Sequence, residues 1–192
     1  MDAQDVGAVV LAAGESRRFG SPKQLALLDG RTLLEHVLER AYAAGLRPVV
    51  AVVPIWLTRP AAMTSEGLRW VRNPHPEWGM SHSLRLGFAA LPDWVAAAVI
   101  LLGDQPTVTI EHLNALQAAR GDRPFVATRH QGLLVPPVLV ERDQFAATEQ
   151  ATGDAGLRDL LRERGDLVAA IDLPAALPDV DTPADLDRMG GW

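Results

Sequence analysis

Continuous apolar runs alternate with amphipathic segments along this chain. The runs 6–12, 48–53 and 96–102 are rich in valine, alanine and leucine and contain no charged residue. Parallel strands that are buried on both faces have this character, because neither face meets water. These three runs therefore predict central strands of a parallel sheet.

The segments between these runs have apolar residues at helical spacing. In 32–44 they are Leu33, Leu34, Val37, Leu38 and Ala41, and Thr32 with Glu35 forms the pattern of a capping box. Further helices are predicted at 81–91, 109–119, 154–163 and 183–189, and shorter strands at 68–71, 125–128, 138–140 and 167–173. Segment 55–67 is assigned no element. Strands that alternate with helices predict an α/β fold with a mostly parallel sheet, and we expect one domain over 1–192.

Composition and charge exclude several functions. A net charge of −6 argues against bulk electrostatic binding of nucleic acid, and the chain has no cysteine for disulfides or thiolate chemistry. The longest apolar stretch, 95–102, is too short to cross a bilayer, and Asp2 and Asp5 have the wrong sign for a secretory signal. We therefore expect a cytoplasmic protein without a nucleic-acid or membrane partner.

The loop after the first strand is a candidate phosphate site. In open α/β sheets ligands bind beyond the carboxyl ends of strands. Small residues at Ala12, Ala13 and Gly14 allow close approach of a ligand to the backbone, and Arg18 and Lys23 supply positive charge. The loop matches neither a P-loop nor a dinucleotide fingerprint. An ordinary solvated loop with surface charges is equally compatible with these residues.

Two acidic segments are candidate metal ligands. Asp104 follows the apolar run 96–102 directly, where a hard cation such as Mg²⁺ would find an oxygen ligand. Asp179 and Asp181 flank Val180, so on extended backbone both would point to one side and could complete a site begun by Asp104. The alternatives are a turn at Asp104 and helix capping by Asp181 or Thr182.

The polar segment 73–85 leads into a predicted helix. Its serines and amides could receive a ribose, a base edge or a phosphate. His75 and His82 lack the spacing of a helical metal site, and Ser81 is the alternative helix cap. Trp56, Trp70, Trp78 and Trp94 are expected to be packing residues rather than stacking platforms.

Five motifs occur in order over nearly the whole chain. They are Leu11-Ala12-Ala13-Gly14 with Ser16, Arg18, Gly20, Pro22 and Lys23; Asn73-Pro74 with Gly79-Met80 and Ser83-Leu84; Leu102-Gly103-Asp104-Gln105-Pro106; Gly153-Asp154 with Gly156-Leu157-Arg158; and Asp179-Val180-Asp181-Thr182-Pro183. Together they resemble the molybdenum-cofactor nucleotidyltransferase family, most closely its cytidylyltransferase branch.

The resemblance implies a Rossmann-like three-layer nucleotidyltransferase fold. It also implies transfer of CMP from CTP to the terminal phosphate of a molybdopterin-type cofactor, with release of pyrophosphate. The implied catalytic residues are Arg18, Lys23 and Asp104, and the implied Mg²⁺ ligands are Asp104 and Asp181. The nucleotide would be bound by Leu11, Ala12, Ala13, Gly14, Lys23, Asn73 and Ser83.

The identities of the nucleotide and of the acceptor each depend on a single position in the sequence. Ala13 favours CTP, because the guanylyl-transferring branch usually has glycine there. Val135 stands where the family commonly shows a second glycine, in a loop expected to face the acceptor. The alternatives are another phosphorylated acceptor, namely a sugar, polyol or other cofactor phosphate, and a non-catalytic cofactor-carrying protein. The resemblance also allows for a chaperone of the receiving molybdoenzyme as a partner.

Overall fold

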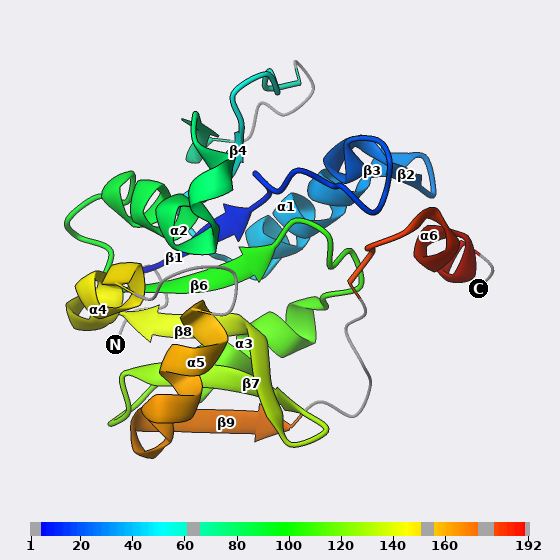
Figure 1. Cartoon of the computed structure of the whole chain (residues 1–192). Coiled ribbons are helices and arrows are strands. Elements are labelled where there is room, and N and C mark those ends of the chain that lie inside the picture. The colour runs from blue at the N-terminus through cyan, green and yellow to red at the C-terminus, as the bar shows by residue number, and fades with distance from the viewer. Residues whose placement is uncertain (1–4, 61–65, 151–155, 173–178, 191–192) are drawn as a thin grey trace.

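A computed structural model describes residues 5–60, 66–150, 156–172 and 179–190 of the chain. Within these ranges the elements form three layers, with a central sheet between two layers of helices (Figure 1). This confirms the predicted α/β class and its three-layer arrangement.

The central sheet contains seven strands of the described residues, in the order β5-β4-β1-β6-β8-β7-β9. The strands are β1 Val6–Leu11, β4 Val49–Pro54, β5 Leu68–Asn73, β6 Ala97–Leu102, β7 Phe125–His130, β8 Leu133–Glu141 and β9 Val168–Asp172. All neighbouring pairs are parallel except the two that β8 makes with β6 and β7. The sheet is therefore mostly parallel, as predicted.

Helices cover both faces of the sheet. They are α1 Leu33–Ala43, α2 Met80–Ala89, α3 Ile110–Ala118, α4 Phe145–Gln150, α5 Gly156–Glu163 and α6 Pro183–Met189. Helices α1 and α3 pack on one face, and α2, α4 and α5 pack on the other. Thr32 and Glu35 form the predicted capping box of α1, and Thr182 forms a second one with Asp185 on α6.

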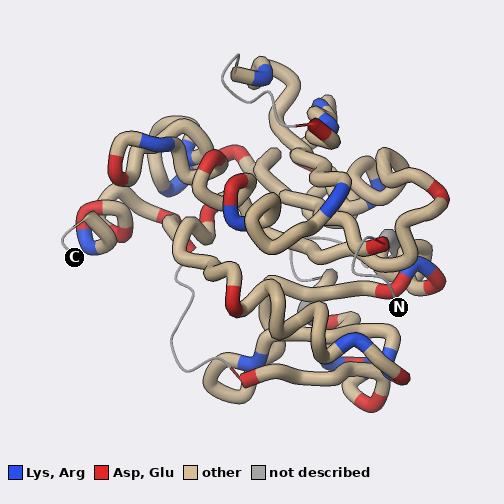
Figure 2. Tube along the Cα trace, turned by 180° about the vertical axis from the view of Figure 1, so that it is seen from behind, with Lys and Arg blue, Asp and Glu red and all other residues tan. Residues whose placement is uncertain are grey.

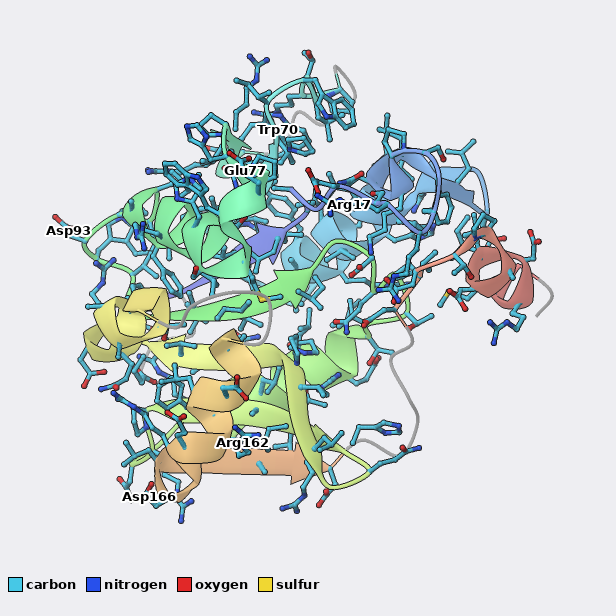
Figure 3. The ribbon with its side chains drawn as sticks, in the orientation of Figure 1. Arg17, Trp70, Glu77, Asp93, Arg162 and Asp166 are labelled. Atoms are coloured by element: carbon cyan, nitrogen blue, oxygen red, sulfur yellow. The ribbon has the colours of Figure 1, made fainter. Side chains whose placement is uncertain are left out.

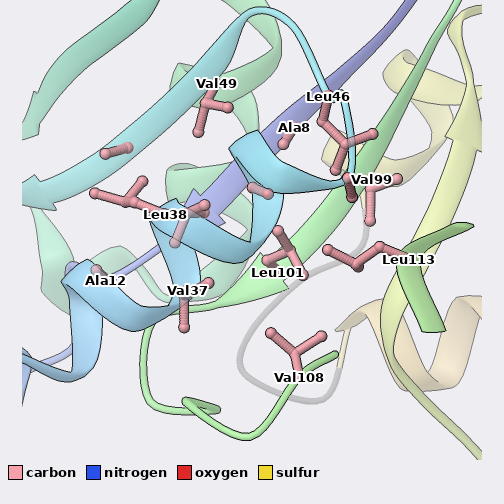
Figure 4. Packing of buried hydrophobic residues seen from close by; sticks show 14 of the residues in the cluster. Ala8, Ala12, Val37, Leu38, Leu46, Val49, Val99, Leu101, Val108 and Leu113 are labelled. Atoms are coloured by element: carbon pink, nitrogen blue, oxygen red, sulfur yellow. The ribbon is translucent and has the colours of Figure 1, made fainter. Parts of the chain in front are cut away.

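Strand alternation divides the core into two clusters. In β1, Ala8 and Val10 face α1 and α3, whereas Val9 faces α2. Figure 4 shows the first cluster, in which Val37 and Leu38 of α1 pack against the sheet. Because strands such as β1 and β4 are buried on both faces, they read in the sequence as continuous apolar runs.

One glycine sets the distance between α2 and the sheet. A Cβ atom on Gly87 would lie 2.3 Å from Val9 Cγ1, which is closer than real contacts allow. The helix therefore packs tightly over β1, and its N-terminal end lies beside the loop that follows that strand.

Several elements differ from the sequence prediction. Strand β8 is longer than the predicted 138–140 and starts at Leu133, because it pairs on both sides and returns antiparallel from β7. A short hairpin of β2 Leu27–Leu28 and β3 Arg31–Thr32, and helix α4, were not predicted. These are short elements, and their apolar patterns are too brief to show a period. The predicted helix start at 154–155 lies outside the described residues.

Candidate functional site

The candidate site lies at the carboxyl ends of β1 and β6. These neighbouring parallel strands point to the same edge, where the loop after β1 and the segment before α6 meet (Figure 1). The two exit loops touch directly, since Gly103 N–H donates to the Leu11 carbonyl at 2.9 Å. A Cβ on Gly103 would come within 2.8 Å of the Ala12 Cβ, so glycine is what permits this contact.

Lys23 joins three separate parts of the chain at this edge. Its ammonium group donates hydrogen bonds to Asp104 Oδ2 and, at 3.3 Å, to Asp181 Oδ1. Arg18 lies on the other oxygen of Asp181, with Nη2 2.9 Å from Oδ2. The residues predicted as catalytic and as metal ligands are thus brought together in one cluster of two cations and two carboxylates.

The charge of Lys23 is stabilised by its neighbours. Partial burial alone would lower the pKa of Lys23, but the carboxylates of Asp104 and then Asp181 outweigh it and hold that pKa above its usual value. The ammonium group is therefore a permanent positive charge at neutral pH. It is held at a strand end, where a polyphosphate would need such a charge.

A buried glutamine fixes the loop after β1. Gln24 donates from Nε2 to the carbonyls of Ala12 at 2.7 Å and Gly14 at 2.8 Å. Ser16 Oγ accepts from the Lys23 amide at 3.1 Å and donates to Gln24 Oε1 at 3.4 Å. Gln24 was not predicted from the sequence, because its spacing does not distinguish a buried side chain that holds the loop from a polar side chain on the surface.

A pocket opens beside this cluster. Its lining includes the predicted nucleotide-binding residues Leu11, Ala12, Ala13, Gly14, Lys23 and Ser83, together with Asp104. An adjoining hollow is lined by Arg18, Lys23 and Asp181, and by Glu77 and Gly79 from the opposite wall. In Figure 3 Arg17 and Glu77 mark the two walls, which come from the loop after β1 and the segment before α2.

Asn73 lies behind the pocket wall. It is fully buried, its Nδ2 donates to Ser83 Oγ at 3.0 Å, and its Oδ1 accepts from the His75 amide at 2.8 Å. Both ends of the amide are therefore used inside the protein. In this structure Asn73 orients Ser83 and the turn before α2, and Ser83 is the residue that reaches the pocket.

The segment before α6 is tied to the exit loop of β6. The Val180 amide donates to the Asp104 carbonyl at 2.9 Å, and Val180 is fully buried. Gln105 Nε2 donates to Asp179 Oδ1 at 2.7 Å. Partial burial and the nearby Asp104 charge raise the pKa of Asp179. Asp179 therefore anchors the segment through Gln105, while Asp181 reaches Lys23.

One carboxylate oxygen has the character of a metal ligand. Asp104 Oδ1 is buried and has no hydrogen-bond partner among the described residues. An acceptor left in this state suits a hard cation, and Mg²⁺ sites use one or two carboxylates together with substrate phosphates. The described part of the chain holds no cluster of three or more histidine or acidic residues that could bind a metal alone. Asp104 with Asp181 thus fits a metal that arrives with a nucleotide.

The segment before α2 excludes Ser81 as the helix cap and brings three rings together. The cap of α2 is Gly79 rather than Ser81, because the helix starts at Met80. His75 stacks on Trp78 with ring centroids 4.1 Å apart, and His82 meets the same indole edge-on.

The tryptophans were expected to pack, and only Trp70 of the four packs against the core. The other three are more than half exposed: Trp56 53%, Trp78 56% and Trp94 58%. The expectation was wrong for these three: Trp56 and Trp94 lie in turns, and Trp78 lies at the end of a short 3-10 helix before α2.

Residues 153–155 and the side chain of Arg158 lie outside what the structure describes. An anion-binding role of that loop stays a prediction. Within the described ranges, no helix is both long and apolar enough to cross a membrane. In the view of Figure 2, basic and acidic segments are interspersed along the trace.

Comparison with known proteins decides the family. Residues 8–170 match the model of the MobA-like NTP transferase domain. The chain belongs to the MobA-like NTP transferase family. As a MobA-like NTP transferase it is a nucleotidyltransferase, and the resemblance to the molybdenum-cofactor nucleotidyltransferases is confirmed.

Relatives of full length agree with this assignment. The purine catabolism protein PucB of Bacillus subtilis is 32% identical over 194 residues, which cover 94% of each chain. The crystal structure of Rv0371c from Mycobacterium tuberculosis superposes with a TM-score of 0.84 at 27% identity, and covers 100% of both chains. A second structure of Rv0371c is a complex with manganese, with a TM-score of 0.81 at 26% identity over 98% of each chain.

Proposed function

We propose that this MobA-like NTP transferase transfers CMP from CTP to the terminal phosphate of a molybdopterin-type cofactor and releases pyrophosphate. The observation that carries the proposal is the position of Lys23. Its ammonium group lies between Asp104 and Asp181 at the mouth of a pocket built from the loop after β1. A cation and two carboxylates meet there beside the loop after β1, and transfer of a nucleotidyl group needs such charged groups in fixed positions.

The acceptor needs no activating base in this reaction. An oxygen of its terminal phosphate is already anionic, so it can attack the α-phosphorus of CTP directly. A new P–O bond forms to this oxygen, the bond between the α-phosphorus and the bridging oxygen breaks, and pyrophosphate leaves with that electron pair. The chain therefore has to position the reactants and stabilise negative charge, which agrees with the absence of histidine among the described residues that line the pocket and the adjoining hollow.

Lys23 and Arg18 would supply the protein's positive charge. Lys23 faces the pocket, and Arg18 is more exposed and lines the adjoining hollow. On binding of the triphosphate both cations can turn from the carboxylates to phosphate oxygens. Gly14, Glu15 and Ser16 line the same hollow, and their backbone amides would suit the leaving pyrophosphate.

Asp104 and Asp181 would hold the divalent metal, which we propose is Mg²⁺. Bound there, it would neutralise charge on the phosphates of the nucleotide. The unpartnered Asp104 Oδ1 supports this role. Rv0371c, to which this chain is similar in sequence and structure, has been crystallised as a complex with manganese.

The choice of CTP rests on Ala13. Ala13 is one of the residues that line the pocket, at the position where guanylyl-transferring relatives usually have glycine. Leu11, Ala12 and Gly14 would contact the nucleotide along the same wall, and Ser83 from the opposite wall. Asn73 would act by holding Ser83 in place.

Pyrophosphate release tests the proposal. The purified protein is incubated with Mg²⁺, molybdopterin-type molybdenum cofactor and either CTP, GTP or ATP. Release that needs the cofactor and occurs with CTP alone is the expected result. Release with GTP would contradict the role of Ala13. If all three nucleotides bind but none reacts, the cofactor is not the acceptor, and sugar, polyol and other cofactor phosphates are then the compounds to screen.

A further inference from the structure

A second hollow lies along the loop after β1. It is lined by Ala13, Gly14 and Gln24, which it shares with the pocket at Lys23, and by Trp56 from the turn after β4. Neither Lys23 nor the carboxylates of Asp104 and Asp181 line it. We call it the Trp56 hollow. The proposed function assigns no ligand to it.

The turn that carries Trp56 is firmly held. The Leu57 amide donates to the Pro54 carbonyl at 3.0 Å, and the Leu57 carbonyl accepts from the Trp70 indole at 3.0 Å. Leu57 is buried, whereas Trp56 is 53% exposed. The Trp56 indole N–H has no hydrogen-bond partner among the described residues. The ring is thus presented to solvent by an ordered turn, and half of its surface is free for a ligand.

The surroundings of the ring suit a flat heterocycle. Pro22, Pro54 and Pro76 line the same hollow and add stiff apolar surface, and Ser16 and Ser21 add small polar groups. A planar base can stack on an indole face and meet polar groups at its edge. The adjoining hollow at Arg18 and Asp181 is polar and suits phosphates instead.

We infer that Trp56 is a stacking platform for the base of the bound nucleoside triphosphate. The inference rests on the proposed function, because it assumes that the α-phosphate lies at Lys23. Gly14 lines both the pocket at Lys23 and the Trp56 hollow. A nucleotide that extends past Gly14 can therefore place its base at Trp56 while its phosphates remain at Lys23 and Arg18.

Nucleotide binding by tryptophan variants tests this inference. CTP, GTP and ATP are titrated with Mg²⁺ into the wild-type protein and into Trp56→Ala, Trp56→Phe and Trp94→Ala, with calorimetry and tryptophan fluorescence as readouts. Trp94 is the matched control, because it is 58% exposed and lies beside Asp93, well away from Arg17 (Figure 3).

We expect the nucleotide to quench wild-type fluorescence and Trp56→Ala to lose most of this quenching. Trp56→Ala should bind between about fivefold and a hundredfold more weakly, which is the range for loss of one stacked base. Trp56→Phe keeps an aromatic face, so its affinity should stay near wild type. Trp94→Ala should keep both the affinity and the quenching.

Three results would overturn the inference. If Trp56→Ala binds nucleotide as tightly as wild type, no base stacks on Trp56, even though cofactor-dependent pyrophosphate release would still support the proposed function. If cofactor without nucleotide causes the Trp56-dependent quenching, the acceptor ring occupies the hollow. If the wild-type protein binds no nucleotide, the proposed function fails as well.

Discussion

Lys23 Nζ donates a hydrogen bond to Asp104 Oδ2, although 81 residues separate the two in sequence. Strand β1 and strand β6 are neighbours in the sheet, so the loops that follow them meet at the same edge. Because Lys23 also contacts Asp181, one ammonium group occupies the space between both carboxylates that would hold a metal.

Replacement of Asp104 should abolish turnover without unfolding the protein. Asp104→Ala removes the unpartnered oxygen proposed as metal ligand, and we expect kcat/KM to fall by at least about a hundredfold. Pyrophosphate release measures the rate and circular dichroism checks the fold. Asp93→Asn, an exposed carboxylate beyond α2, is the control and should behave as wild type. Turnover that survives in Asp104→Ala would contradict the metal assignment.

Replacement of Lys23 should affect rate and metal binding in opposite directions. Lys23→Met removes charge stabilisation at the phosphates, so kcat/KM should fall by about two decades or more. It also frees Asp104 and Asp181 from their present partner, so Mn²⁺ should bind more tightly than to wild type when no nucleotide is present.

Electron paramagnetic resonance of free Mn²⁺ measures this change. Arg31→Met, which removes an exposed cation of β3 that pairs with Glu39, is the matched control and should leave Mn²⁺ binding as in wild type. Equal Mn²⁺ affinity of wild type and Lys23→Met would show that Lys23 does not compete for the metal ligands.

Replacement of Gln24 should loosen the loop after β1. Gln24→Ala leaves the buried Ala12 carbonyl and the Gly14 carbonyl without their donor, which should cost about 1–3 kcal/mol in the free energy of unfolding. The KM for the nucleotide should rise as well, because the same loop lines the pocket. Urea unfolding and steady-state kinetics check the two effects. A variant as stable as wild type would mean that Gln24 does not hold the loop.

Buried His112 should make stability fall in mild acid. Its Nε2 lies 2.8 Å from Thr128 Oγ1, which itself donates to the Pro137 carbonyl, so Nε2 carries the proton. Burial lowers the pKa of His112 to about 4. Between pH 4 and the usual pKa of 6.5, the unfolded chain binds a proton at His112 that the folded protein does not bind. The contribution of neutral His112 to the free energy of unfolding is therefore fully present above pH 6.5 and declines below it.

Urea unfolding between pH 7 and pH 4 measures this effect. By pH 4 the loss attributable to His112 should reach about 3 kcal/mol. His112→Gln should have a shallower pH dependence than wild type, whereas His130→Gln, at the end of the same strand as Thr128, should not. Parallel curves for wild type and His112→Gln would rule out this contribution.

The layers of the fold could be predicted because the central strands are buried on both faces. Val9 and Val10 pack into opposite core clusters, so both are apolar. The strand therefore appears in the sequence as a continuous apolar run that can be recognised. The direction of β8 could not be predicted, since an antiparallel strand with the same two-sided burial gives the same pattern. Its start at Leu133 could not be predicted either, because the prolines at 136 and 137 argue against a strand there.

The site could be predicted in part, through charged residues that follow apolar strands. Lys23, Asp104 and Asp181 were all expected, and the structure brings them into contact. Gln24 and the exposure of Trp56 could not be predicted. Whether a loop residue is buried or exposed depends on neighbours distant in sequence, such as the carbonyl of Ala12 for Gln24.

The most direct test follows the α-phosphate of CTP. CTP carrying ³²P at the α-position is incubated with the protein, Mg²⁺ and molybdopterin-type cofactor, and the cofactor is then isolated. The account predicts label in a cytidylyl-cofactor product formed by wild type and not by Asp104→Ala. Unlabelled cofactor, from a protein that binds CTP, would contradict the claim that this site transfers CMP to that acceptor.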